Sequence, residues 1–319
     1  MAEPSAPSGA WGLAERGSAG ALRLGAALYR LLGRRGMRIL LGPIALYFWL
    51  AAADARRASR DYLATLWRFP GGQEVLGRPP GRLTELRHIR EFAVNILDRV
   101  LVWGGAFQEI QFEHSGSEHL FRLAREKRGG ILLGSHLGSF DLMQLLATEH
   151  HLVVNVLTFT AHSERITAFL RALDPQSRLR VIQMDPSSMR TAFEVRACLK
   201  RGEFVGMLAD RLPPGRNNHA AARAFLGRGA LWSLQPFRLA AVLGAPLLVA
   251  SCVRRGEDRY RAEVVPLYPG GILPRGEREA HAQQWLSRFV AHVERTCLEA
   301  PTQWFNFYDF WAAAPGDNP

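Results

Sequence analysis

The chain has 319 residues, of which 48% are hydrophobic and 10% aromatic, and its formal net charge is +11. This apolar content excludes disorder along the whole length, and the length fits one large domain or one domain with an appended helical segment. The charge alone would suggest nucleic acid as a partner. Only two of the 40 basic residues are lysines, however, and many of the arginines surround an apolar run rather than a recognisable nucleic-acid-binding motif.

The N-terminal part of the chain has the composition of a membrane-facing segment. We expect a flexible tail over residues 1–15 and helices over 16–105 that associate with a membrane. Nine arginines and one acid, Asp54, lie between Arg16 and Arg60, on both sides of the fifteen uncharged residues Ile39–Ala53. Spanning a bilayer takes roughly 20 residues. We therefore expect a helix in the membrane interface with arginines at anionic headgroups. A buried core helix and a single span remain alternatives.

Further along, helical spacing predicts helices over residues 85–103 and 117–127. Short apolar runs then alternate with helix-like segments, and a last amphipathic helix covers 277–299. This alternation predicts an α/β fold with a mostly parallel central sheet flanked by helices on both faces. We expect residues 106–319 to form this domain, as one compact unit with the preceding helices. The runs interpreted as strands are 131–135, 152–159, 179–184, 204–210, 245–253 and 259–268.

The cysteines and histidines give no sign of a metal site. The three cysteines lie far apart without C-x-x-C spacing, which favours a reducing, cytoplasmic environment and buried thiols. The histidines at 114–119 and 149–151 lack a recognised zinc spacing. We expect no metal and no cofactor. The cysteines are Cys198, Cys252 and Cys297.

One histidine stands out by its context. His136 ends a strand-like run in "GGILLGSHLGSFDLM", and Asp141 begins the helix that follows. The pair therefore sits at the carboxyl edge of the sheet, where open α/β sheets bind ligands. A carboxylate bonded to one ring nitrogen raises the basicity of the other, and Gly134 and Gly138 allow close backbone approach around the ring. This arrangement predicts a general base, with a buried core histidine as the alternative.

Four blocks in order resemble the glycerolipid and lysophospholipid acyltransferase superfamily. The third block has Leu226 and Gly227 where phosphatidic-acid-forming members carry Pro-Glu-Gly, and in this it is similar to the bacterial lipid A late acyltransferase branch. The resemblance covers about 120 residues. The blocks are His136 with Asp141, Gly206–Arg211 (GMLADR), Phe225–Arg228 (FLGR) and Gly244–Ala250 (GAPLLVA).

The resemblance implies roles for the polar residues of these blocks. His136 would be the general base and Asp141 its orienter. Arg211 would bind an anionic part of a substrate, and Asp210 would hold that arginine or the turn beside it. An arginine after a central strand also offers a planar fork for phosphate or carboxylate, although a surface salt bridge to Asp210 is an alternative. Two further candidates, either of which could instead be a solvated charge, would neutralise the phosphopantetheine arm of the donor: Arg190 and Arg228.

We therefore expect an acyltransferase at the cytoplasmic face of a bacterial inner membrane. It would move an acyl chain from acyl carrier protein or coenzyme A to a hydroxyl or amine of a lipid-like acceptor, without nucleic acid as a partner. Rival functions are an inactive membrane-associated scaffold of the same fold, a basic nucleic-acid-binding protein and a lipid hydrolase. The closing aromatics Trp304–Trp311 either line the acyl groove or pack in the core.

Overall fold

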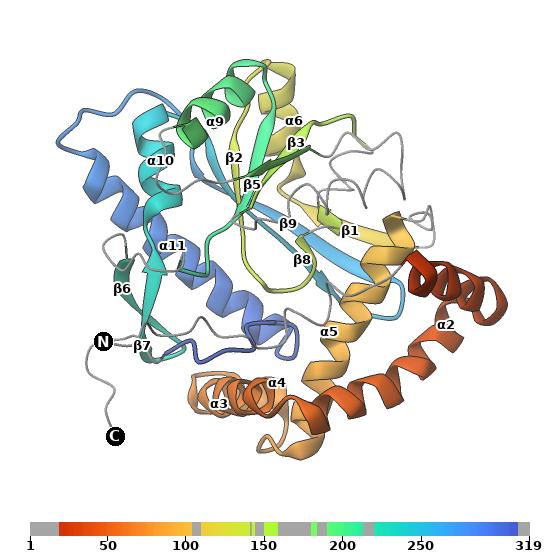
Figure 1. Cartoon of the computed structure of the whole chain (residues 1–319). Coiled ribbons are helices and arrows are strands. Elements are labelled where there is room, and N and C mark those ends of the chain that lie inside the picture. Colours follow the sequence, from red (N-terminus) through yellow and green to blue (C-terminus); the bar gives the residue numbers. More distant parts are fainter. Residues whose placement is uncertain are drawn as a thin grey trace, which may run out of the picture.

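The computed structural model describes residues 19–103, 110–140, 142–143, 150–158, 180–183, 190–212 and 220–311. A seven-stranded sheet in the order β1-β9-β8-β2-β5-β3-β4 forms its centre (Figure 1). Strands β8, β2, β5, β3 and β4 are parallel to one another, whereas β9 is antiparallel to β8 and pairs in parallel with β1. The predicted α/β class with a mostly parallel sheet is confirmed. The predicted tail and the boundary at 105/106 lie outside the described residues.

The helices of the described residues are α2 Ala19–Ala51, α3 Ala53–Arg68, α4 Gly72–Leu76, α5 Arg82–Trp103, α6 Ser117–Arg125, α9 Arg190–Lys200, α10 Gln235–Leu243 and α11 Arg278–Glu299. The strands are β1 Gln111–Ser115, β2 Ile131–Gly134, β3 Val154–Thr158, β4 Arg180–Gln183, β5 Phe204–Leu208, β6 Ala220–Phe225, β7 Arg228–Ser233, β8 Leu247–Arg254 and β9 Arg259–Tyr268. Strands β6 and β7 form a separate two-stranded sheet.

The main sheet is covered on both faces, and this explains its nearly continuous apolar strands. In β2, Ile131 and Leu133 point into a core shared with α3, α9, α10 and α11. Leu132 points the other way, into a core shared with α6 and with Leu142 and Met143. Because side chains alternate along a strand, one short apolar run serves both cores.

The N-terminal helices divide the apolar run differently from the prediction. Helix α2 is kinked at Gly33, where φ is 63°, and it ends at Ala51. Ala52 is not helical, with φ of −99° and ψ of 79°, so Ile39–Ala53 is not one uninterrupted helix. Among the described residues, no individual helix meets the length and hydropathy needed to cross a bilayer. The stretches Gly36–Ala51 and Ala53–Arg68 meet these criteria only together, across a bend of 97°.

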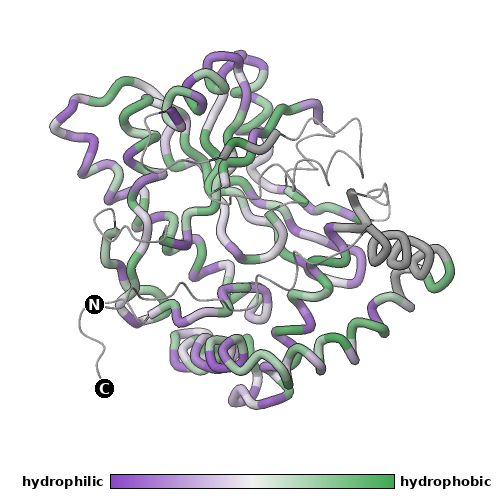
Figure 2. Tube along the Cα trace, in the orientation of Figure 1, coloured by the Kyte–Doolittle hydropathy of each residue, from purple (hydrophilic) through white to green (hydrophobic). Residues whose placement is uncertain are grey.

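Helix α2 packs on α5 through a narrow stripe and leaves much of its apolar surface exposed. Leu41 and Ala45 are buried, Leu41 against Val94 and Leu97 of α5. Eight other described apolar side chains of α2 are exposed, and the helix forms a hydrophobic arm at the edge of the molecule (Figure 2). This exposed face comprises Leu31, Leu32, Ile39, Leu40, Ile44, Leu46, Tyr47 and Leu50.

One of the flanking arginines has an internal partner instead of the expected headgroup contact. Arg38 is buried, and its Nη2 lies 3.0 Å from Oδ2 of Asp98 on α5. The Tyr260 hydroxyl of β9 donates to the same carboxylate. Since a buried charge requires a partner, this group fixes α2 to the body of the protein.

The hairpin β6–β7, together with α10 and β1, was not predicted from the sequence. Phe225 pairs with Arg228 across a two-residue turn in which both Leu226 (φ 52°) and Gly227 (φ 81°) have positive φ. Such turns match the twist of a hairpin, and leucine is unusual at such a position. Leu226 is nevertheless buried, and its N–H donates to Glu294 Oε1 at 2.6 Å. The Phe225–Arg228 block is therefore a hairpin turn docked on α11.

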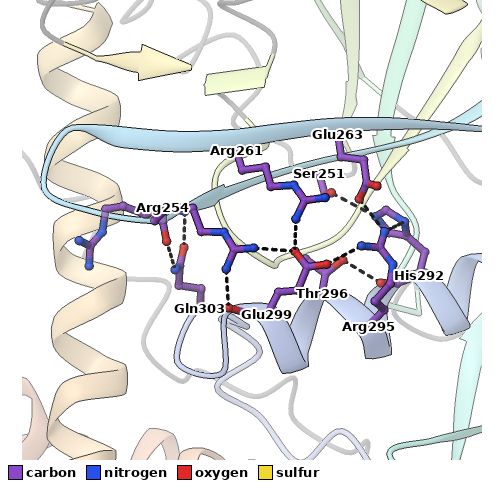
Figure 3. Close-up of polar contacts among 10 residues, drawn as sticks. Ser251, Arg254, Arg261, Glu263, His292, Arg295, Thr296, Glu299 and Gln303 are labelled. Carbon is purple, nitrogen blue, oxygen red and sulfur yellow. Dashed lines mark hydrogen bonds and ion pairs between the residues drawn. The ribbon is translucent and has the colours of Figure 1, made fainter. Parts of the chain in front are cut away.

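Polar contacts attach α11 and the segment after it to β8 and β9 (Figure 3). Glu299 accepts hydrogen bonds from Arg255, Arg261 and Arg295. Further along, the Gln303 amide pairs with the main chain of Arg254, accepting from its N–H and donating to its carbonyl, both at 2.8 Å. This places residues 303–306 beside the end of β8, next to the turn that follows β2.

Candidate active site

The register of the sheet brings His136 and Asp210 together. Strands β2 and β5 are parallel neighbours, and Gly134 is paired with Leu208 at their last aligned positions. His136 and Asp210 each lie two residues beyond this pair, so both leave the carboxyl edge at the same level. Ligands of open α/β sheets bind at this edge.

Asp210 bonds both the ring and the main chain of His136. Its Oδ1 lies 2.8 Å from His136 Nδ1, and its Oδ2 accepts the His136 backbone N–H at 2.8 Å. The Asp210 side chain is fully buried, whereas that of His136 is 18% exposed. Burial opposes ionisation of Asp210, but the charge and hydrogen bonds of His136 and the charge of Arg211 outweigh it and lower the pKa of Asp210 to about 2. An ionised carboxylate only accepts, so Nδ1 carries the hydrogen and Nε2 is the basic atom of the neutral ring.

The turn that carries His136 is held by the segment after α11. Phe305 N–H donates to the His136 carbonyl at 2.6 Å, and Gly138 N–H donates to the Gln303 carbonyl at 2.8 Å. Leu137 and Trp304 form an antiparallel bridge between these bonds. These contacts satisfy main-chain groups of an irregular loop.

Glycines allow this turn to approach its neighbours, which are the Cys252 carbonyl and the Phe140 ring rather than the imidazole of the prediction. Gly138 has φ of 65°, and a Cβ there would lie 2.0 Å from the Cys252 carbonyl oxygen. A Cβ on Gly134 would lie 2.3 Å from the ring of Phe140, and one on Gly206 would lie 3.0 Å from the same ring. Phe140 therefore lies over both strands, directly after the His136 turn.

Arg211 is linked to the pair through the side chain of Asn306. Its Nε donates to Asn306 Oδ1 at 2.6 Å, and its Nη2 donates to the Phe305 carbonyl at 3.2 Å. The guanidinium lies over the Tyr308 ring, 5.3 Å from the centroid. Asn306 Nδ2 donates to Asp210 Oδ2 at 2.9 Å. Asp210 thus bonds His136 and Asn306, and the alternative of a surface salt bridge with Arg211 does not describe this buried group.

The other predicted site residues lie in different surroundings. Asp141, the predicted orienter of His136, lies outside the described residues. Arg190, at the start of α9, is exposed and pairs with Glu194. Arg228 lies at the start of β7, donates to Asp61 and Thr65 of α3 and stacks on the Trp311 ring. These contacts connect the hairpin to α3.

The closing aromatic segment is largely part of the core. Trp304, Phe310 and Trp311 are buried and pack with Phe225 and Trp232 of the hairpin. Of the two interpretations of this segment, core packing describes these side chains. In the part of the chain that the structure describes, no three His, Cys, Asp or Glu side chains come together in a way that could hold a metal ion.

Residues 89–312 match the family model of the bacterial lipid A biosynthesis acyltransferases. The chain belongs to this family. The match covers well over half of the sequence, and it includes His136, Asp210, Arg211 and Asn306. A comparison with curated protein sequences finds no match. Membership of the lipid A acyltransferase family supports an enzyme that transfers an acyl group to a lipid-like acceptor, and it agrees with the resemblance seen in the four sequence blocks.

Two residues of this site were missed by the sequence analysis. Asn306 is the one uncharged residue in "WFNFYDFW" that is not aromatic, and a polar residue inside an aromatic run is a signal for a buried hydrogen bond. Asn95 of α5 donates to the Gly138 carbonyl at 2.6 Å, and nothing in its sequence context singles it out. The contact between Asp210 and His136 was also missed, although both residues directly follow buried strands.

Proposed function

We propose that the protein transfers an acyl chain from a thioester donor to a hydroxyl or amine of a lipid-like acceptor, with His136 as general base. The observation that carries this proposal is the His136–Asp210 pair at the carboxyl edge of β2 and β5. A fully buried carboxylate that bonds Nδ1 makes Nε2 the proton acceptor, which is the arrangement general-base catalysis requires. The sequence-based role of Asp141 as a second orienter remains part of the proposal.

In the proposed reaction, His136 Nε2 takes the proton as the acceptor oxygen or nitrogen attacks the thioester carbonyl carbon. The carbon–sulfur bond then breaks, and the leaving thiolate takes the proton back from the imidazolium, so protons and electron pairs balance. The N–H groups of Gly138 and Ser139 already donate to Gln303 and Cys252 carbonyls. Arg211, which has five N–H donors beside the site, is therefore our candidate for stabilising the oxyanion or an anionic substrate group.

We further propose that the enzyme acts at the cytoplasmic face of a bacterial inner membrane. The exposed apolar face of α2 supports this, because such a contiguous face is typical of a helix that inserts into the lipid interface. The donor is either acyl carrier protein or acyl coenzyme A. The net charge of +11 favours the carrier protein, since an acidic partner is steered to a basic surface.

A labelled-acyl assay tests this function. Purified protein is incubated with labelled acyl carrier protein, or with labelled acyl coenzyme A, and a bacterial membrane lipid extract. A new labelled lipid that is lost in His136→Ala but not in the exposed control His151→Ala is the expected result. Free labelled fatty acid would indicate a hydrolase, and no turnover with either donor would favour the scaffold. A His136→Ala protein that is folded and works at the native rate would overturn the proposal.

A further inference from the structure

We propose that Asn306 is a positioning residue that separates Arg211 from Asp210 and so keeps the Asp210 carboxylate directed at His136. This inference rests on the proposed function only for its consequence in catalysis. The arrangement itself is a property of the folded protein, and it can be tested without substrate.

The Asn306 side chain lies between two oppositely charged groups. Nδ2 donates to Asp210 Oδ2 at 2.9 Å, and Oδ1 accepts from Arg211 Nε at 2.6 Å. Asn306 is 2% exposed, so water does not replace either bond. The amide has only one orientation here, because a carboxylate accepts and a guanidinium donates.

Without this amide, the charges would be expected to pair directly. Arg211 follows Asp210 in the sequence, and a guanidinium beside a buried carboxylate forms a strong, often bidentate pair. The observed guanidinium instead turns to Asn306, the Phe305 carbonyl and the Tyr308 ring. Oδ1 of Asp210 is thereby left on His136 Nδ1, and Arg211 acts on Asp210 through its charge rather than by direct hydrogen bonding.

The chemistry of the side chain explains why asparagine suits this position. A leucine has nearly the same shape but neither donates nor accepts, so Arg211 would be released to compete for Asp210. An aspartate would still accept from Arg211 but would place a second carboxylate against Asp210. Asparagine alone among side chains of this size offers a donor on one branch and an acceptor on the other.

The test compares the His136 ring in three variants by ¹⁵N NMR of labelled histidine. In wild type we expect hydrogen on Nδ1. Asn306→Leu should shift the ring toward the other tautomer or toward exchange between both, because Arg211 now competes for Asp210. Asn306→Leu with Arg211→Gln should restore the Nδ1–H form, since the competitor is gone. The matched control is Asn155→Leu, which removes another buried amide that donates to a carboxylate, that of Glu203. Asn155 lies near the amino end of β3, away from the carboxyl edge of the sheet where His136 and Asp210 lie.

Kinetics supply the second measurement. Asn306→Leu should lower kcat by about tenfold to a hundredfold, a partial loss of a general-base contribution that is typically 10²–10⁴-fold, with KM changed less than about threefold. Asn155→Leu should leave kcat nearly unchanged. Among the residues that the structure describes, the charged or titratable groups around this contact are His136, Asp210, Arg211, Tyr308 and Cys297, so all measurements are made at one pH.

The outcomes separate this inference from the proposed function. An unchanged His136 tautomer in folded Asn306→Leu overturns the inference, whatever the activity. A changed tautomer that Arg211→Gln does not restore overturns the idea of competition. If the tautomer behaves as expected but no acyl donor is turned over, the positioning role is supported and the proposed function fails.

Discussion

Asp210 forms two hydrogen bonds with His136, one carboxylate oxygen with ring Nδ1 and the other with the backbone N–H of the same residue. The two bonds fix both the ring and the start of the turn on which it sits. A single buried carboxylate thus sets the tautomer and the place of the histidine.

Replacing this carboxylate is expected to disable the enzyme while leaving its fold. In Asp210→Asn the amide can donate to the ring, which favours the wrong tautomer, and the equivalent change in serine proteases costs about 10⁴-fold in kcat. We expect a loss of about 10³-fold or more, measured by single-turnover acyl transfer. The exposed Asp54→Asn serves as control. If Asp210→Asn is active and Asp141→Asn is not, orientation of His136 belongs to Asp141.

Buried histidines are expected to make the free energy of unfolding depend on pH in the mildly acidic range. Burial lowers the pKa of His88 to about 4, against a smaller opposing effect of its bond to the Trp304 carbonyl. The unfolded chain, with histidine near 6.5, then binds more protons between pH 6.5 and 4, so stability is full above 6.5 and falls toward pH 4 by about 3 kcal/mol. His88→Gln should remove this loss in urea unfolding at pH 7.5 and 4.5.

His292 provides an independent check on the same effect. Burial, followed by the charge of Arg295, lowers its pKa to about 4 as well. His292→Gln should therefore remove a similar share of the pH dependence, and the double variant should remove both shares. His281→Gln, on the outer side of α11, is the control. An unchanged slope in His88→Gln would contradict the assignment.

The packing of Phe140 over Gly134 can be tested by a double-mutant cycle. Gly134→Ala places a methyl group 2.3 Å from the Phe140 ring, so the ring must move, at about 1–3 kcal/mol in unfolding free energy. Activity should fall with it, because Phe140 directly follows the His136 turn. Adding Phe140→Leu should recover much of both losses. Gly81→Ala, where nothing lies within 4 Å, is the control, and additive effects of the two changes would argue against the contact.

The exposed face of α2 should determine binding to lipid vesicles. Ile39→Glu and Leu50→Glu each remove an apolar side chain worth roughly 2 kcal/mol of burial and add a negative charge, so the double variant should bind anionic vesicles more than tenfold less tightly. Phe193→Glu is the control, because it makes the same kind of change at an exposed apolar residue of α9. Flotation measures binding. Equal flotation of the α2 variant and wild type would contradict the membrane role of this helix.

Regular periodicity carried most of the fold prediction. The range 259–268 matches β9 at both ends, and the predicted helix over 277–299 begins one residue before α11. Hairpin β6–β7 was not predicted, because "AAARAF" has no β-branched residues and the turn has Leu226 where glycine or asparagine is usual. The end of α2 at Ala51 was not predicted, because an apolar, alanine-rich run contains no helix stop signal.

The sequence identified His136, Asp210 and Arg211 as candidate site residues, but not the contacts that join them. His136 was found because a strand, glycines and a helix surround it. Its bond to Asp210 depends on β2 and β5 being adjacent, and the order of strands in a sheet is not written in local periodicity. Asn95 of α5 contacts the His136 turn, and Asn306, from the segment after α11, contacts Asp210, so the roles of both residues arise from tertiary contacts alone.

The short ladder between residues 136–138 and 303–305 also sets the order in which the protein can mature during translation. When the ribosome has made the chain as far as α11, both His136 and Asp210 have been synthesised. Residues 303–305, which brace the His136 loop, have not. Contacts between such distant segments form late in folding. The loop that carries His136 can therefore be braced only after the residues beyond α11 have been synthesised and have docked beside β8.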